Sequence, residues 1–256
     1  MNDATHPGPV PGNAYLNRTV LILVSIAMVG FGAFSALQGF DFAAYPLVTH
    51  FHAVSMAAWL LLLATQSILG SGGKLDLHRR LGWLGAGLAV FIVVTGIAVA
   101  FKTIMLGRLP PIFEPGYFLM LGLVNMVNFA IIVAAGIATR GNTAWHRRFM
   151  LGSILVVFEP VLGRVLPFFI VPAIGGPDNL LPFLEQHRTE LEVLRIGVHL
   201  AIIGIVMLGD RLVTGRFHPV FILLLLAVTA LYAIVNVVGG SAPFEAFAAG
   251  LQPTLP

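Results

Sequence analysis

Residues 81–104 read LGWLGAGLAVFIVVTGIAVAFKTI, and Lys102 is the one charged side chain among them. A helix needs about 20 mostly apolar residues to cross the hydrocarbon core of a bilayer. The stretch has no regular alternation of apolar and polar side chains, which the strands of a membrane barrel require. It therefore predicts a membrane-spanning helix.

The same pattern recurs along the chain, which has 256 residues, of which 58% are hydrophobic and 10% are charged. A soluble domain carries about 25% charged residues. We therefore expect an all-α fold, a polytopic transmembrane helical bundle of about seven helices. The expected helices are 18–38, 49–70, 81–104, 117–139, 149–171, 192–213 and 218–239.

The polar ends of the chain predict short tails at 1–17 and 240–256 around one transmembrane domain, 18–239. The first apolar run lacks the basic segment and cleavage site of a signal peptide, so we expect it to be retained. Lys and Arg gather in the loops on one side, which predicts a bacterial inner-membrane protein with a cytoplasmic N-terminus and a periplasmic C-terminus. The basic residues on that side are Arg18, Lys74, Arg79, Arg80, Arg140, Arg147, Arg148, Arg211 and Arg216.

The composition excludes several classes of protein. There is no cysteine, which excludes disulfides, iron–sulfur clusters, zinc–thiolate sites and c-type haem attachment. The pI is about 9.7, but the basic residues lie in short loops between apolar runs, so we expect no nucleic-acid partner. The lipid bilayer is the expected partner.

Two segments repeat one motif: LDLHRRLGWLG at 75–85 and TAWHRRFMLGS at 143–153. GRFHPV at 215–220 is a weaker third copy. Each copy ends a loop and opens a helix, so we expect three repeated helical hairpins, made by the second and third, fourth and fifth, and sixth and seventh helices. The arginines are typical of anchors to lipid phosphates. The histidines at the three helix starts are His78, His146 and His218.

Residues 52–82 follow the pattern H-x13-Q-x11-H-R-R-L-G, with His52, Gln66 and His78 at its fixed positions. This pattern resembles a group of uncharacterised bacterial predicted membrane proteins, as does DRLVTGRFHP at 210–219. The resemblance covers about an eighth of the chain and implies a multi-helix inner-membrane protein, without an activity. A looser resemblance is to cytochrome b561 proteins, which bind haem through paired histidines. Here, however, no helix carries two histidines spaced to serve both faces of the membrane.

Ionisable residues inside the expected helix 149–171 are the strongest pointers to a site, because each costs about 2.5–3.5 kcal/mol on insertion scales. They are Glu159, followed by Pro160, and Arg164. Proline frees a carbonyl one turn back in the helix. Five residues put the two charges about 140° apart around a helix, so we expect each to reach other helices inside the bundle.

Polar residues of other helices lie at a matching depth. We therefore expect a polar cavity in the outer half of the membrane, with Glu159 as a proton relay. The alternative is a purely structural network in which Glu159 neutralises Arg164. The expected lining is His52, Asn125, Glu159, Arg164, Arg195 and His199, and Asn125, Arg164, Arg195 and Gln66 are the candidates for binding a substrate or an anion.

Three classes of function remain open. The first is a b-type haem or quinone-linked redox protein, because haem b takes two imidazoles from facing helices. Its outer ligand pair is His52 with His199, and its inner pair is His78 with His146 or His218. The second is a metal-dependent lipid hydrolase, although this chain lacks the H-x-x-x-H pair on the last helix that is typical of such enzymes. The third is a non-catalytic transporter, sensor or assembly protein that binds a small anion or a lipid headgroup. The hydrolase would draw its ligands from His50, His52, Ser55, His187 and His199.

Overall fold

The computed structural model describes residues 11–37, 44–110 and 112–253, and within these ranges the structure is helical, without strands. Six helical segments are long and apolar enough to cross a membrane, and a bent pair provides up to one more. The predicted all-α, polytopic bundle is confirmed. The helices are α1 (Pro11–Leu37), α2 (Leu47–Ser71), α3 (Leu75–Met105), α4 (Pro115–Ala138), α5 (Thr143–Leu155), α6 (Glu159–Ala173), α7 (Leu180–Gln186), α8 (Arg188–Thr214), α9 (Pro219–Ile234) and α10 (Ala242–Ala249).

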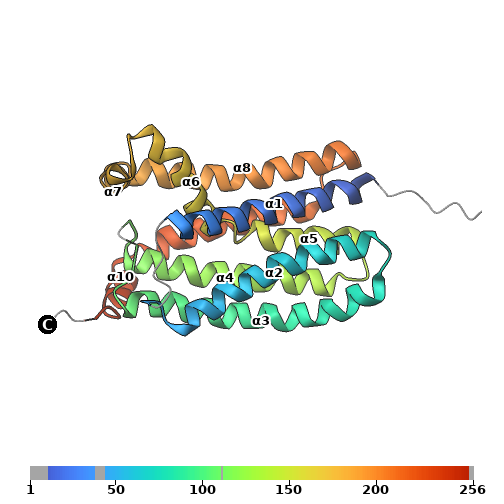
Figure 1. The fold of residues 1–256 in the computed structure, drawn as a ribbon, viewed down its shortest axis with the longest axis horizontal. Helices are drawn as coiled ribbons and strands as arrows, with labels where there is room; N and C mark the ends of the chain where they lie inside the picture. The colour runs from blue at the N-terminus through green and yellow to red at the C-terminus, as the bar shows by residue number, and fades with distance from the viewer. Residues whose placement is uncertain (1–10, 38–43, 111, 254–256) are drawn as a thin grey trace, which may run out of the picture.

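The long helices run side by side along the longest dimension of the molecule (Figure 1). One end, on the right of Figure 1, carries the start of α1 and the turns at 72–74, 139–142 and 215–218; we call it the basic end. The opposite end carries α7 and α10. The short turns join α2 to α3, α4 to α5 and α8 to α9 as antiparallel hairpins, as the repeated motif predicts.

The fifth expected helix, 149–171, is not one helix in the structure. Helix α5 ends at Leu155, α6 begins at Glu159, and their axes are bent by 53°. Pro160 accounts for the break, because it lacks the amide hydrogen that would continue the helix and its ring clashes with the preceding turn. Proline is instead favoured in the first turn of a new helix. The prediction of a continuous helix was therefore wrong at this point.

The segment after α9 packs against α4 within the residues that the structure describes, which end at Pro253. A π-helical turn, η3 (Val235–Gly239), follows α9 and leads to α10. The Glu245 side chain of α10 accepts a hydrogen bond of 2.7 Å from the backbone amide of Gly116, at the start of α4. Gly116 has to be glycine, because a Cβ there would lie 2.5 Å from the carbonyl oxygen of Gly239. This contact satisfies an amide that the first helical turn leaves unpaired.

Candidate functional site

A buried ion pair lies where the fifth span breaks. Glu159, the first residue of α6, forms a salt bridge with Arg195 of α8, and their side chains are only 7% and 11% exposed. Removing two charges from water is costly, and direct pairing offsets part of that cost. The pair therefore ties the broken span to α8, and it confirms that Glu159 faces the interior of the bundle.

The pair belongs to a longer polar network that reaches the opposite end. Arg195 also donates a hydrogen bond of 2.7 Å to the hydroxyl of Tyr117 on α4. Tyr117 in turn donates to Glu192 over 3.0 Å, and Asn236 of η3 donates to the same carboxylate oxygen over 3.0 Å. Asn236 is exposed, so the network runs from the surface to the buried break.

His199 of α8 is fully buried beside this network, and both of its ring nitrogens have partners. Its Nε2 atom lies 2.7 Å from the carbonyl oxygen of Leu155, and its Nδ1 atom lies 2.9 Å from the hydroxyl of Tyr232 on α9. A carbonyl only accepts, so Nε2 carries the proton and Nδ1 accepts from the tyrosine. A ring held in this way has no free nitrogen for a metal.

Arg164 does not join the network in the same manner. Its guanidinium donates to the carbonyl of Pro160 over 3.0 Å and lies over the rings of Phe31 and Phe34 on α1, 4.8 and 5.9 Å from their centres. Among the described residues it makes no salt bridge, because Glu159 bonds to Arg195. Glu159 and Arg164 thus lie in the same helix, α6, but bond to different partners.

The other two residues expected at the cavity lie in contacts of their own. The Nδ1 atom of His52 is 3.1 Å from the hydroxyl of Thr95 on α3, which itself donates to the carbonyl of Phe91 over 2.8 Å. Asn125 is buried in α4, and its side-chain oxygen has no hydrogen-bond partner among the described residues. Of the six expected lining residues, Glu159, Arg195 and His199 are thus brought together at the break.

A second group of expected residues meets at the basic end. The rings of His78 and His146 are 6.0 Å apart between centres, with planes inclined by 83°. Nδ1 of His78 lies 3.3 Å from the carbonyl of Gln66, and Nδ1 of His146 lies 2.8 Å from the carbonyl of Gly136. Each Nδ1 therefore carries a proton, so Nε2 is the atom that bears the lone pair for a metal in the neutral form of each ring.

Gln66 lies in the same contact. Its side-chain amide donates to the carbonyl of His78 over 2.9 Å, while its Oε1 atom is buried without a donor. The second and third fixed positions of the H-x13-Q-x11-H-R-R-L-G pattern thus touch each other. The first, His52, lies further along α2, paired with α3.

His218, the third histidine of the repeat, lies at the start of α9 and has partners of its own. It is the residue before α9, and its Nδ1 accepts a hydrogen bond of 3.4 Å from the amide of Val220. Its ring packs against Trp145, 5.1 Å between centres. Burial, together with the charge of Arg148, holds the pKa of His218 below its usual value. His218 therefore acts as a helix cap rather than as a partner of the His78–His146 pair.

Near the basic end, Arg148 of α5 and Asp210 of α8 form a second buried ion pair. Nε and a terminal nitrogen of Arg148 donate to the two oxygens of Asp210 over 3.0 and 2.7 Å, and the aspartate side chain is fully buried. The repeated motif predicts a lipid anchor for Arg148, and no sequence pattern assigned a role to Asp210. The position of Asp210 inside the expected helix 192–213 is the signal that could have pointed to a partner.

The ligand set proposed for a metal hydrolase does not assemble. Within the part of the chain that the structure describes, no three His, Asp or Glu side chains gather in a way that could hold a metal ion. His199 and His52, two of the expected ligands, are engaged as described above. The geometry gives the hydrolase hypothesis no support.

No protein-family model matches this chain, and comparisons with curated proteins and with solved structures find no match. The resemblance to uncharacterised bacterial membrane proteins and the looser one to cytochrome b561 proteins therefore remain predictions. The function has to be inferred from the site itself.

Proposed function

We propose that the protein is a b-type haem redox protein of the bacterial inner membrane, in which His78 and His146 would hold the haem iron. The observation that carries the proposal is the distance of 6.0 Å between the centres of the two rings. A metal–imidazole bond is about 2 Å long, and the centre of each ring lies about 1 Å beyond its bonded nitrogen. Two imidazoles on opposite sides of one metal ion would therefore have centres about 6 Å apart. The pair comes from two different hairpins, as haem b ligation between helices requires.

The protonation of the two rings also supports this ligation. Each Nδ1–H donates to a backbone carbonyl, of Gln66 or of Gly136. Such bonds fix the tautomer and the orientation of a metal-binding histidine and increase its basicity. The outer pair that the sequence offered is less suitable, because both nitrogens of His199 are occupied.

The charge at the basic end suits a haem as well. Haem b carries two carboxylate groups, and the two copies of the repeated motif place arginines directly after the ligands. Arg79 and Arg80 are exposed beside His78, and Arg147 follows His146. Arginine binds carboxylates through a planar fork of donors. When bound, the haem supplies one-electron chemistry, and the chain's own part is to hold and orient it.

A quinone is the electron partner that we propose, because it is soluble in the same hydrocarbon as the helices. The positive-inside rule further places the basic end, and with it the haem, on the cytoplasmic side. Reporter fusions at Gly72 and Gly141 should then read as cytoplasmic and a fusion at Gly175 as periplasmic. The reverse pattern would overturn this orientation.

The experiment that tests the function is a haem titration of the purified protein. We expect one haem per chain, and we expect His78→Ala and His146→Ala each to weaken binding by at least about tenfold, since second-shell losses alone cost 10–100-fold. His52→Ala and His199→Gln are the matched controls and should bind as the parent does. Equal losses in the controls, or no binding by the parent protein, would contradict the proposal.

A further inference from the structure

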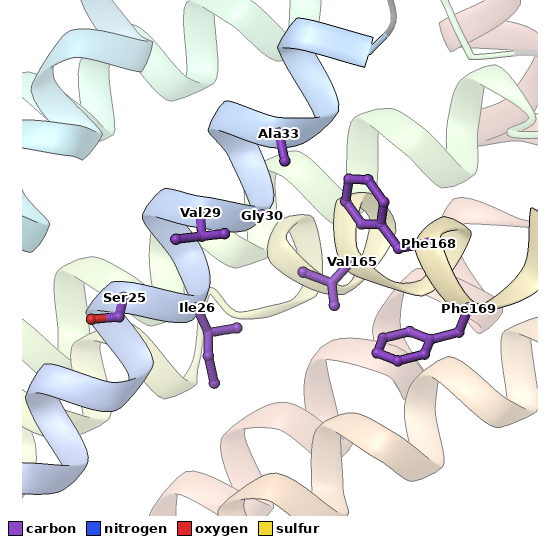
Figure 2. Close-up of a pocket in the computed structure, with 8 residues that line it drawn as sticks. All are labelled: Ser25, Ile26, Val29, Gly30, Ala33, Val165, Phe168 and Phe169. Carbon is purple, nitrogen blue, oxygen red and sulfur yellow. The ribbon is translucent and has the colours of Figure 1, made fainter.

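A groove opens on the side of the bundle between α1 and α6, far from the two histidines discussed above. Its volume is about 510 Å³, and its walls are apolar apart from one serine. Figure 2 shows Val165 and Phe169 of α6 pointing into the space beside α1. The lining residues are Ser25, Ile26, Val29, Gly30, Ala33, Val165, Phe168 and Phe169.

The break in the fifth span creates this groove. Gly30 of α1 lets α6 approach closely, since a Cβ there would lie 2.6 Å from a methyl carbon of Val165. Helix α6 is bent by 53° from the direction of α5, so its path past α1 differs from that of α5. A groove of this kind, on a membrane span, faces lipid chains.

Arg164 supplies a positive charge at the same α1–α6 contact, directly before Val165. Its guanidinium packs on Phe31 and Phe34 and uses one donor for the carbonyl of Pro160. Arginine has five donors. A cation within a membrane span is costly without a counter-ion, and no carboxylate among the described residues bridges to it.

Among the described residues, the two carboxylates of the polar network are already engaged. Glu159 bonds to Arg195, and Glu192 accepts from Tyr117 and Asn236. The donors of Arg164 that the Pro160 carbonyl leaves unused could therefore bind a further anion. An apolar groove beside an arginine matches a molecule with an apolar chain and an anionic head.

We infer that this site binds an anionic phospholipid, with one acyl chain in the groove and the phosphate on the guanidinium of Arg164. The alternative occupants differ in one property each. A zwitterionic lipid has the same chains without the net charge, and a soluble phosphate ester has the phosphate without the chains. The site should prefer the molecule that has both.

The test is native mass spectrometry of the purified full-length protein with dioleoyl phosphatidylglycerol or dioleoyl phosphatidylcholine. We expect the anionic lipid to bind at least about tenfold more tightly, because a desolvated charge contact is worth more than 1.4 kcal/mol. If the parent protein binds the two lipids with equal affinity, this result alone overturns the inference, and no variant is needed. Equally tight binding of sn-glycerol 3-phosphate, which has no acyl chain, also overturns it.

Two variants test the contribution of the lipid headgroup and that of its acyl chain separately. Arg164→Gln should remove the preference for the anionic lipid, and Ser25→Phe should fill the groove and weaken both lipids. Arg140→Gln is the matched control, because Arg140 also bonds a backbone carbonyl, over 3.1 Å, and packs on an aromatic ring, that of Trp83. A preference that survives in Arg164→Gln, or that is lost equally in Arg140→Gln, contradicts the assignment. Neither Arg164→Gln nor Ser25→Phe should change the haem content. The lipid site and the proposed haem function can therefore be contradicted independently of each other.

Discussion

The imidazole of His199 donates from Nε2 to the carbonyl oxygen of Leu155, 2.7 Å away, at the residue where α5 ends. The carbonyls of the last helical turn have no amide partner within their own helix. In a membrane each such group has to be satisfied by another part of the protein. His199 thus helps to stabilise the break on which the polar network is built.

We expect His199→Leu to destabilise the protein by about 1–3 kcal/mol, because it leaves the Leu155 carbonyl with only the 3.4 Å hydrogen bond from the amide of Phe158 and removes the partner of the Tyr232 hydroxyl. Thermal unfolding in detergent measures this. His199→Gln, which can donate to one of the two partners, should lose less. An unchanged melting temperature in the leucine variant would show that the bond does not support the break.

The ion pair between Glu159 and Arg195 predicts non-additive effects. Arg195→Leu leaves a buried carboxylate unpaired and should cost about 3–5 kcal/mol. The double variant Glu159→Leu with Arg195→Leu removes both charges and should be more stable than the single arginine variant. Unfolding curves of the two single variants and the double variant test this, and strictly additive losses would contradict a direct pairing.

Arg148 forms two hydrogen bonds with the carboxylate of Asp210, so we expect that a lysine at position 148 cannot replace its contribution to stability. Lysine carries its charge on one nitrogen and cannot match the two carboxylate oxygens through a planar fork. We expect Arg148→Lys to lower the melting temperature nearly as much as Arg148→Met. A lysine variant as stable as the parent would mean that charge alone maintains the contact.

His218 predicts a dependence of stability on pH. Its pKa is lowered in the folded protein, because burial and the charge of Arg148 disfavour the protonated ring. The unfolded state, with an ordinary pKa of about 6.5, therefore takes up a proton first as the pH falls. The contribution of His218 is present above pH of about 6.5 and is lost on acidification below it.

Melting temperatures between pH 7.5 and pH 5 measure this contribution. Asn at the same position can still cap the helix but does not titrate. The melting temperature of His218→Asn should therefore fall less on acidification than that of the parent protein. If the parent and the variant lose stability in parallel, the histidine has no part in the acid sensitivity.

The helical, membrane-spanning fold could be predicted from apolar runs such as 81–104, because burial in lipid imposes length and composition on each span. The break at 156–158 was missed. Proline is tolerated within membrane helices, so Pro160 alone does not distinguish a kink from a division into two helices. The sequence did place Glu159 and Arg195 at a matching depth, but it offered Arg164 as the partner that neutralises Glu159, whereas the structure pairs Glu159 with Arg195.

The rest of the network was missed for a different reason. Tyrosines near the ends of spans, such as Tyr117 and Tyr232, are common in the aromatic belts of membrane proteins and give no sign of a polar partner. Which histidines meet depends on the packing order of the helices, and the periodicity of a sequence does not contain that order. For this reason the sequence left His146 and His218 as equal partners of His78, whereas the structure pairs His78 with His146.

The absorption spectrum of the purified protein tests the central proposal most directly. Ligation by His78 and His146 predicts a Soret band with the features of low-spin iron. His146→Gly should then shift the spectrum to that of iron with one protein ligand, and added imidazole should restore it. A protein without a Soret band, or a low-spin spectrum unchanged in both His78→Gly and His146→Gly, would contradict the account.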